Sequence, residues 1–322
     1  MNCSIRGLAV IVVASSLCNV ASAQTYPSKP VRMIVPFPPG GGTDYTARLI
    51  GQKLSELWGQ AVVIENRPGA STIIGSDLVA KSAPDGYTLL MGSTNHTINP
   101  SLISKLPYDT VRDFAPITVC ITSAYVLVVH PSLPVRSVKE LIALARARKG
   151  EINYSSSGTS GPQHIAGELF KMMAKVDMIH VPYKGGGPAV VALLGGHVQV
   201  QFSTPVSALP HVKTGKLRAL AVTSLERSAA VPALPTVAEA ALPGYEAETW
   251  WGLLAPARTS RDIVDKVHTD VVKALQQPDT LEKLAREGVR PSGSTPAQFT
   301  AMIDKDMVTM AKVVKAADIK ID

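Results

Sequence analysis

The segment "IVPFPPGGGTDYTARLI", residues 34–50, decides the fold class, because an apolar strand-like run ends in Pro and Gly and a helical pattern begins at once. Ala47, Ile50, Leu54 and Leu57 continue that pattern and give the expected helix one buried stripe. The same succession recurs at "NRPGASTIIG", "YSSSGTSGPQHIAGE" and "YKGGGPAVVALL". This alternation of β-like and helical runs predicts an α/β fold with helices on both faces of its sheets.

Local patterns predict where the strands lie and where several helices begin. A Ser or Thr followed three residues later by an acidic residue or Gln predicts helix starts at Ser137, Ser160 and Thr259. Cys120 lies in the apolar run "FAPITVCITSAYVLVV" and is interpreted as a buried strand thiol. The nine predicted strands cover residues 31–37, 61–67, 87–93, 125–131, 152–158, 179–185, 198–205, 217–224 and 251–257.

The four Gly/Pro-rich corners predict a site for an anionic ligand. Glycine lets backbone N–H groups approach a ligand closely, and a helix N-terminus presents unpaired donors with about half a positive charge. In open α/β sheets such corners lie at the carboxyl ends of strands, where ligands bind. Pro162 and Pro188 suit the first turn of a helix, because the N–H group that they lack would be unpaired there. We therefore expect a Gly42→Val substitution to weaken binding more than Lys184→Gln does.

The first residues have the features of a secretory leader. Arg6 supplies a positive start, "GLAVIVVASSL" an apolar centre, and "ASA" the small residues of a cleavage site after Ala23, so we predict a signal peptide at residues 1–23. Lipid attachment to Cys18 remains an alternative, although Leu17 before it is bulkier than such sites usually allow. No further stretch reaches transmembrane length, so the product is expected to be soluble and exported.

Charge and composition argue against several classes of protein. The formal charge is +7 at pH 7, but Lys and Arg are scattered and aromatic residues make up 5% of the chain, so a nucleic-acid partner is not expected. The seven histidines form no HxxxH or HExxH pair, so neither a metal site nor a cofactor is expected. Of the three cysteines, Cys3 and Cys18 fall in the leader and only Cys120 remains, so an intrachain disulfide is impossible after cleavage.

Two motifs resemble catalytic ones without matching them. "GGGTD" is not a phosphate loop, since no Gly-Lys-Ser/Thr follows at the required spacing. "SSSGTSGPQH" offers Ser160 as a nucleophile near His164, but the GxSxG elbow is absent and helix capping with Gln163 also explains Ser160. A hydrolase that uses Ser160 or His164 therefore stays a minor alternative, and we expect no catalytic residue.

Other polar and aromatic residues near the corners have two interpretations each. Asp44 either caps a helix or accepts a hydrogen bond from the ligand, and His96 either lines a cleft or lies in an ordinary loop. Trp250 and Trp251 either form a cleft wall or belong to the core. Because successive side chains of a strand point to opposite faces, at most one of the two is expected to face a ligand.

Several motifs in order resemble one family. They are "YPSKPVRMIVPFPPGGGTDYTAR", "IENRPGASTIIGSDLVAKSAPDGYTLLMG", "SSGTSGPQHIAGELFK", "VPYKGGGPAVVALLGGHVQVQF", "ALAVTSLERSAAVPALPTVAEA" and "WGLLAPARTS". They are similar to the Bug family of periplasmic solute-binding proteins of tripartite tricarboxylate transporters. The resemblance implies a type II periplasmic-binding-protein fold with a ligand cleft between two lobes, residues 24–124 with 246–322 and residues 125–245.

The resemblance also implies a carboxylate ligand held by loop amides, small hydroxyl groups and waters. The implied binding residues are Phe37, Pro38, Gly40, Gly41, Gly42, Thr43, Asp44, Thr94, Asn95, His96, Ser157, Gly158, Thr159, Ser160, Gly161, His164, Tyr183, Lys184 and Gly185. The implied partner is a membrane permease, with presentation of the ligand to a sensor kinase as the alternative. We expect a monomer that closes about a hinge onto its solute.

Overall fold

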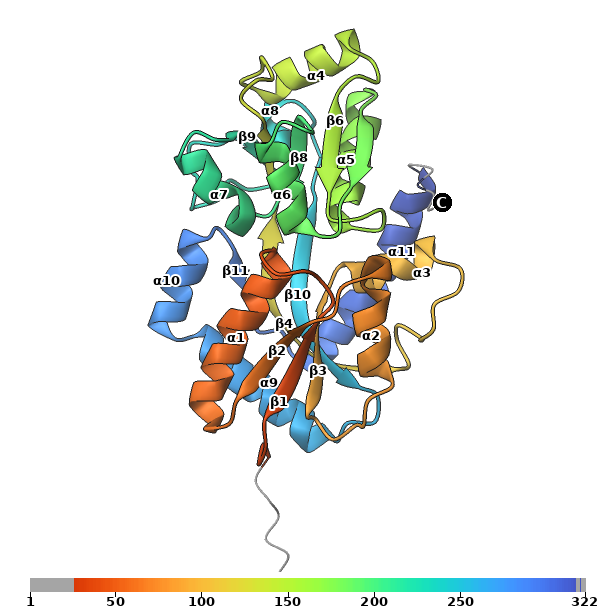
Figure 1. The fold of residues 1–322 in the computed structure, drawn as a ribbon, viewed down its shortest axis with the longest axis vertical. Helices are drawn as coiled ribbons and strands as arrows, with labels where there is room; N and C mark the ends of the chain where they lie inside the picture. The colour runs from red at the N-terminus through yellow and green to blue at the C-terminus, as the bar shows by residue number, and fades with distance from the viewer. Residues whose placement is uncertain (1–25, 317–318, 320–322) are drawn as a thin grey trace, which may run out of the picture.

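The computed structural model describes residues 26–316 and Ile319, which form two β-sheets with helices packed around them (Figure 1). The predicted signal peptide and its cleavage site lie outside the described residues. Within those residues, no helix combines the length and the apolar character that crossing a membrane requires.

The first sheet, in the lower half of Figure 1, has six strands in the order β11-β4-β10-β3-β1-β2. β1 is parallel to β2 and β3, whereas β10 is antiparallel to β3 and β4, and β11 is antiparallel to β4. The strands are β1 (Val31–Val35), β2 (Val62–Asn66), β3 (Thr88–Ser93), β4 (Phe114–Ala124), β10 (Glu248–Pro256) and β11 (Arg290–Pro291).

The second sheet, in the upper half, has five strands in the order β7-β6-β8-β5-β9. β6 is parallel to β7 and β8, and β5 is antiparallel to β8 and β9. The strands are β5 (Val126–Val129), β6 (Asn153–Ser156), β7 (Ile179–Pro182), β8 (Val200–Ser203) and β9 (Arg218–Val222).

Most of the helices follow a strand directly, as the repeated corners predict. The helices are α1 (Gly42–Trp58), η1 (Ala70–Thr72), α2 (Ile73–Ala80), α3 (Asn95–Leu102), α4 (Val138–Ala147), α5 (Pro162–Ala174), α6 (Gly186–Leu194), α7 (Pro205–Lys213), α8 (Val237–Ala240), α9 (Arg261–Leu275), α10 (Pro278–Arg286) and α11 (Pro296–Ala316).

The chain passes between the two sheets twice, and Thr223 joins the two crossings. The first crossing is at Tyr125, between β4 and β5, and the second lies between β9 and β10. The Thr223 hydroxyl accepts a hydrogen bond from the Tyr125 backbone N–H at 2.7 Å and lies 2.6 Å from the carbonyl oxygen of Ala247, to which it donates. The two connections are therefore bonded to each other at the junction of the sheets.

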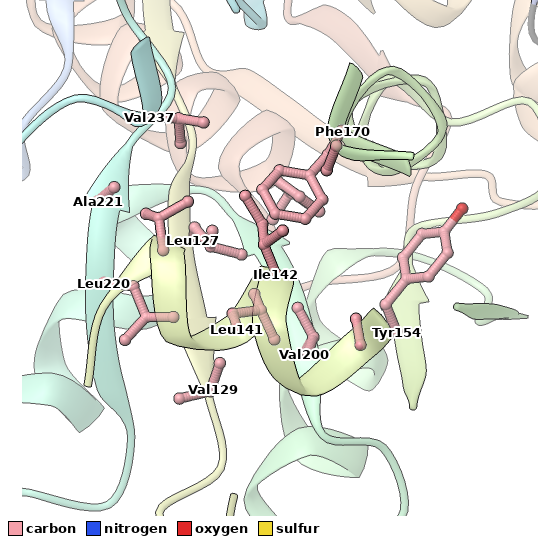
Figure 2. Close-up of a cluster of buried hydrophobic side chains, with 14 of the residues drawn as sticks. Leu127, Val129, Leu141, Ile142, Tyr154, Phe170, Val200, Leu220, Ala221 and Val237 are labelled. Carbon is pink, nitrogen blue, oxygen red and sulfur yellow. The ribbon is translucent and has the colours of Figure 1, made fainter. Parts of the chain in front are cut away.

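Each sheet has apolar packing on both faces, which is why its strands are rich in Val, Ile and Leu. Figure 2 shows one such cluster, in which Leu127 and Val200 of the second sheet meet Leu141 of α4 and Phe170 of α5. Burying a side chain of this size stabilises the fold by ~1.5–3 kcal/mol. Tyr154 lies at the edge of this cluster, and its hydroxyl points away from the aliphatic side chains.

All nine predicted strands are present, and the strand predicted around Cys120 is β4. Cys120 is fully buried, and burial raises the pKa of its thiol to about 12. The Ser137 cap is confirmed, since its hydroxyl accepts from the backbone N–H of Glu140. The Thr259 cap is wrong by one residue: Ser260 caps α9, while the Thr259 hydroxyl donates to the Pro256 carbonyl.

Candidate functional site

A small cavity of ≈ 40 Å³ lies between the two sheets, at the ends of strands from both. Its walls come from segments far apart in the chain. The lining residues are Phe37, Gly41, Gly42, Thr43, Ser93, Asn95, Tyr125, Ser157, Pro162, Gln163, Gly186, Thr204, Thr249 and Trp251.

Five helix N-termini meet at this cavity. Two of them, α1 and α3, follow strands of the first sheet, and three of them, α5, α6 and α7, follow strands of the second. The lining residues Gly42, Asn95, Pro162 and Gly186 are the first residues of α1, α3, α5 and α6, and Thr204 is the N-cap of α7. Each end carries unpaired N–H groups and part of a positive charge, so their fields add inside the cavity.

None of the side chains that line the cavity is charged, yet several are polar and buried. Gln163 is 3% exposed, and its Oε1 has no hydrogen-bond partner among the described residues. The hydroxyl of Tyr125 lies beside Thr249 in the same wall. Buried polar groups are normally hydrogen-bonded, so the unpaired Oε1 atom of Gln163 indicates space for a polar ligand or water.

Asp44 is hydrogen-bonded to the Pro/Gly corner and does not itself line the cavity. Its carboxylate accepts from the Gly40 backbone N–H at 3.1 Å, from Arg48 at 3.0 Å and from Asn66 at 2.9 Å. Burial alone would raise the pKa of Asp44, but these donors outweigh burial and lower it. Gly40 has φ +92°, a conformation that glycine adopts without steric cost. Asp44 is therefore occupied within the protein, and it shapes the loop that ends at the cavity.

Gly42 allows the indole ring of Trp251 to lie against the start of α1. A Cβ atom at Gly42 would lie 2.3 Å from Cζ2 of that ring, which no real contact permits. Trp250, the preceding residue, faces the opposite side of β10, where its ring meets Phe299 and its Nε1 donates to Asp306 at 2.9 Å. The two side chains point to opposite faces of the strand, as predicted, and of the two only Trp251 lines the cavity.

A larger groove of ≈ 600 Å³ adjoins the cavity and shares Phe37, Asn95 and Ser157 with it. Lys184 lies in this groove, where it is exposed, and it does not line the cavity. The remaining groove residues are Pro36, Pro38, Pro68, Gly69, Ala70, Ser71, Thr72, Gly158, Thr159, Ser160, Pro182 and Tyr183.

Polar contacts join the half of the protein that is built on the first sheet to the half that is built on the second. The Nδ2 atom of Asn95, in α3, donates to the carbonyl oxygen of Ser160 at 3.1 Å. Ser207, in α7, donates to the carbonyl oxygen of Gly40 at 3.5 Å. The cavity is thus bounded by both sheets and their helices.

Comparison with known proteins identifies the family. A family model described as "Tripartite tricarboxylate transporter family receptor" matches residues 46–319. The chain belongs to this family. Protein BugT of Bordetella pertussis is 39% identical over 321 residues, which are 98% of each chain, so the resemblance to the Bug family is confirmed.

Two solved structures that are similar to this receptor contain dicarboxylates. R. palustris Rpa4515 with adipate is 38% identical, with a TM-score of 0.89 over 92% of this chain and 99% of that one. MatC from Rhodopseudomonas palustris with bound malate is 32% identical, with a TM-score of 0.84 over 90% of this chain and 100% of that one. The periplasmic binding protein BugD is also similar, at 30% identity, with a TM-score of 0.88 over 92% of this chain and 99% of that one. This likeness and the two sheets confirm the predicted periplasmic-binding-protein fold.

The structure of this receptor brings twelve of the predicted residues to the cavity or the groove. Six line the cavity: Phe37, Gly41, Gly42, Thr43, Asn95 and Ser157. Three of these also line the groove, where Pro38, Gly158, Thr159, Ser160, Tyr183 and Lys184 join them.

The other predicted residues lie outside both spaces. His96 is buried, with its Nε2 atom 3.0 Å from the Thr110 carbonyl, and burial lowers its pKa to about 4. The Thr94 hydroxyl accepts a hydrogen bond from the backbone N–H of Trp250 in β10. The remaining residues of this group are Gly40, Asp44, Gly161, His164 and Gly185.

Ser160 does not act as the predicted helix cap. α5 begins at Pro162, and its N-cap is Gly161. The Ser160 hydroxyl is buried without a partner among the described residues, while the Nδ1 atom of His164 bonds the Thr159 carbonyl. The nucleophile–base contact that a hydrolase needs is therefore not formed between Ser160 and His164.

Several cavity residues were not predicted from the sequence, although a local pattern marks one of them, Thr204. Thr204-Pro205 follows β8 directly and opens α7, the same strand–Pro–helix pattern that pointed to Pro162. Tyr125 and Thr249 lie at or near the crossings between the sheets, and no local pattern in the sequence marks them.

Proposed function

We propose that this protein is an exported receptor that reversibly binds a small organic acid in the site between its two sheets. The observation that carries the proposal is the meeting of five helix N-termini at a cavity lined by no charged side chain. Fixed backbone dipoles then neutralise the carboxylate, and each hydrogen bond to it contributes ~1.5–3 kcal/mol. Lys184, exposed in the groove, has a secondary role.

The volumes indicate how the acid is divided between the two spaces. The cavity, at ≈ 40 Å³, is much smaller than the adjoining groove, at ≈ 600 Å³. We therefore assign one carboxylate group to the cavity, where the helix ends meet. The rest of the molecule then lies in the adjoining groove. The dicarboxylates named with two similar structures support ligands that have a second polar end.

Binding would be coupled to closure of two lobes, residues 24–124 with 246–322 and residues 125–245. The support is that the chain changes sheets at Tyr125 and between β9 and β10, so a hinge there would move one set of helix ends against the other. Membership of a transporter receptor family supports a periplasmic location and delivery of the acid to a tripartite membrane permease. Cleavage of the predicted leader after Ala23 and a monomeric state are further parts of the proposal.

Thermal unfolding with matched acids and amides tests this proposal. We expect adipate or malate to stabilise the protein, because a ligand at 100 times its Kd adds ~2.7 kcal/mol. Adipamide has the same carbon chain without the charge and should give no shift. Equal stabilisation by adipate and adipamide would refute binding of a carboxylate by the helix N-termini. Recovery of a chemically changed acid would refute reversible binding.

A further inference from the structure

A pair of stacked histidines lies directly behind the loop that forms one wall of the site. The rings of His164 in α5 and His180 in β7 have centroids 3.7 Å apart and planes that differ by 6°. Neither residue lines the cavity or the groove. Neither histidine is therefore placed to contact an acid that is bound in the cavity or the groove.

His180 holds the beginning of the loop. Its Nε2 atom lies 2.6 Å from the Ser156 hydroxyl, which also donates to the Gly158 carbonyl at 2.9 Å and accepts from the Gly158 N–H at 3.2 Å. A hydroxyl has one proton and two lone pairs, so all three bonds form when Nε2 of His180 is the donor. Burial, with the charge of His164 as a further cause, lowers the pKa of His180 to about 3. The ring is therefore neutral at pH 7, and Nε2–H is its single N–H group.

His164 holds the other end of the loop. Its Nδ1 atom bonds the carbonyl oxygen of Thr159, and since a carbonyl only accepts, Nδ1 carries the proton. Its Nε2 atom faces Glu168 at 3.7 Å. Glu168 also accepts from Tyr154 at 2.6 Å and from Lys171 at 2.8 Å. Burial would raise the pKa of Glu168, but the neighbouring His164, Lys171 and Tyr154 outweigh it and hold the pKa at about 2.

The loop between these two hydrogen-bonded ends, residues 156–160, contributes to the cavity, to the groove and to the contact between the two halves. Ser157 lines the cavity and the groove, and Gly158, Thr159 and Ser160 continue the groove wall. The carbonyl of Ser160 receives the hydrogen bond from Asn95 of the other half. A shift of the loop would therefore alter the cavity, the groove and the contact between the halves together.

We propose that His164 and His180 are positioning residues, which hold loop 156–160 in its binding conformation through Nδ1–H of His164 and Nε2–H of His180. This inference rests on the proposed function, because the loop is assigned to an acid-binding site. Neither imidazole touches the acid.

The two histidines use different ring nitrogens, which gives a test by opposite amide substitutions. The amide nitrogen of Asn corresponds in position to Nδ1, and that of Gln corresponds to Nε2. We therefore expect His164→Asn and His180→Gln to bind adipate and malate within about threefold of the wild type, since each keeps the hydrogen bond. His164→Gln and His180→Asn lose it and should bind about tenfold more weakly in calorimetry. His130→Asn, which alters a histidine bonded to Ser132 away from the site, is the matched control and should leave binding unchanged.

A purely structural role would make both amides at one position equally damaging, so equal effects of Asn and Gln at each position would overturn the proposal. Two measurements on the unliganded protein decide it if neither acid binds, a result that would count against the proposed function separately. Long-range ¹H–¹⁵N spectra should show a proton on Nδ1 of His164 and on Nε2 of His180, and an unprotonated nitrogen at either of these positions would refute the assignment. Exchange of the Gly158 amide hydrogen should be faster in His180→Asn than in His180→Gln, and equal rates would contradict the anchoring.

Discussion

Replacing Gly42 by alanine tests how the start of α1 contributes to binding. A Cβ atom there would lie 2.3 Å from Cζ2 and 2.7 Å from Cη2 of Trp251, whereas ordinary contacts begin near 3.4 Å. The ring is buried, at 3% exposure, and packs in the core of the first sheet. Either the indole or the first turn of α1 must therefore move by about 1 Å, with a cost of ~1–3 kcal/mol in stability for overpacking.

The same displacement changes the site, because both residues line a cavity of only ≈ 40 Å³. A shift of about 1 Å takes a hydrogen bond of ~2.9 Å out of the range in which it contributes. Losing one bond to a carboxylate costs ~1.5–3 kcal/mol, so we expect adipate or malate to bind at least about tenfold more weakly, and Gly42→Val to be worse.

Calorimetry on folded protein, checked by circular dichroism, measures the change in affinity. Gly59→Ala is the matched control: Gly59 follows α1 at its other end, has φ +61°, and a Cβ atom added to it would meet no other atom within 4 Å. It should lower stability by ~1 kcal/mol without altering the affinity. If Gly42→Ala binds as tightly as the wild type, the corner is only a turn and the start of α1 does not contribute to binding.

Three further results are expected. Lys184→Gln should weaken binding by ~1 kcal/mol or less, because its ammonium group is exposed. An affinity loss larger than that of Gly42→Ala in the same calorimetry would contradict binding of the carboxylate mainly by helix N-termini. Because the pKa of Glu168 is about 2 in the folded protein, below its ordinary value of 4.5, its stabilisation is present above pH 4.5 and is lost as the pH falls toward 2. Urea unfolding should show this as a loss on the order of 2 kcal/mol that Glu168→Gln lacks, and parallel pH profiles would refute it. Iodoacetamide at pH 8 should leave Cys120 unmodified until the protein unfolds, since burial raises the pKa of its thiol to about 12, and rapid labelling of the native protein would contradict this.

The corners of the site could be predicted from sequence because their signal is local. Gly and Pro between an apolar run and a helical pattern identified the starts of α1, α5 and α6, and the same rule applied to Thr204-Pro205 would have found α7. Gly42 was selected for backbone freedom, whereas the structure shows that the close approach of Trp251 is the reason for glycine there.

Residues whose role depends on distant partners could not be assigned in this way. His96 follows a strand like the other candidates, yet it packs edge-on against Phe114 and away from the cavity. Tyr125 and Thr249 come together with the helix ends only because the chain crosses between the sheets twice. Such placements depend on tertiary packing, which the pattern of one segment does not encode.

The division of the helix ends between the two halves explains how a receptor without a charged side chain in its cavity could still couple binding to closure. Two of the five N-termini belong to the first sheet and three to the second, so their fields add at one point only while the halves are together. A fixed lysine or arginine in the cavity would attract a carboxylate in the open form as well, and would oppose its departure. With dipoles divided between the proposed lobes, opening would remove a large part of the stabilisation and would admit water to the acid in the same movement. Under the proposed function, tight binding in the closed form and ready release on opening then follow from one arrangement of backbone groups.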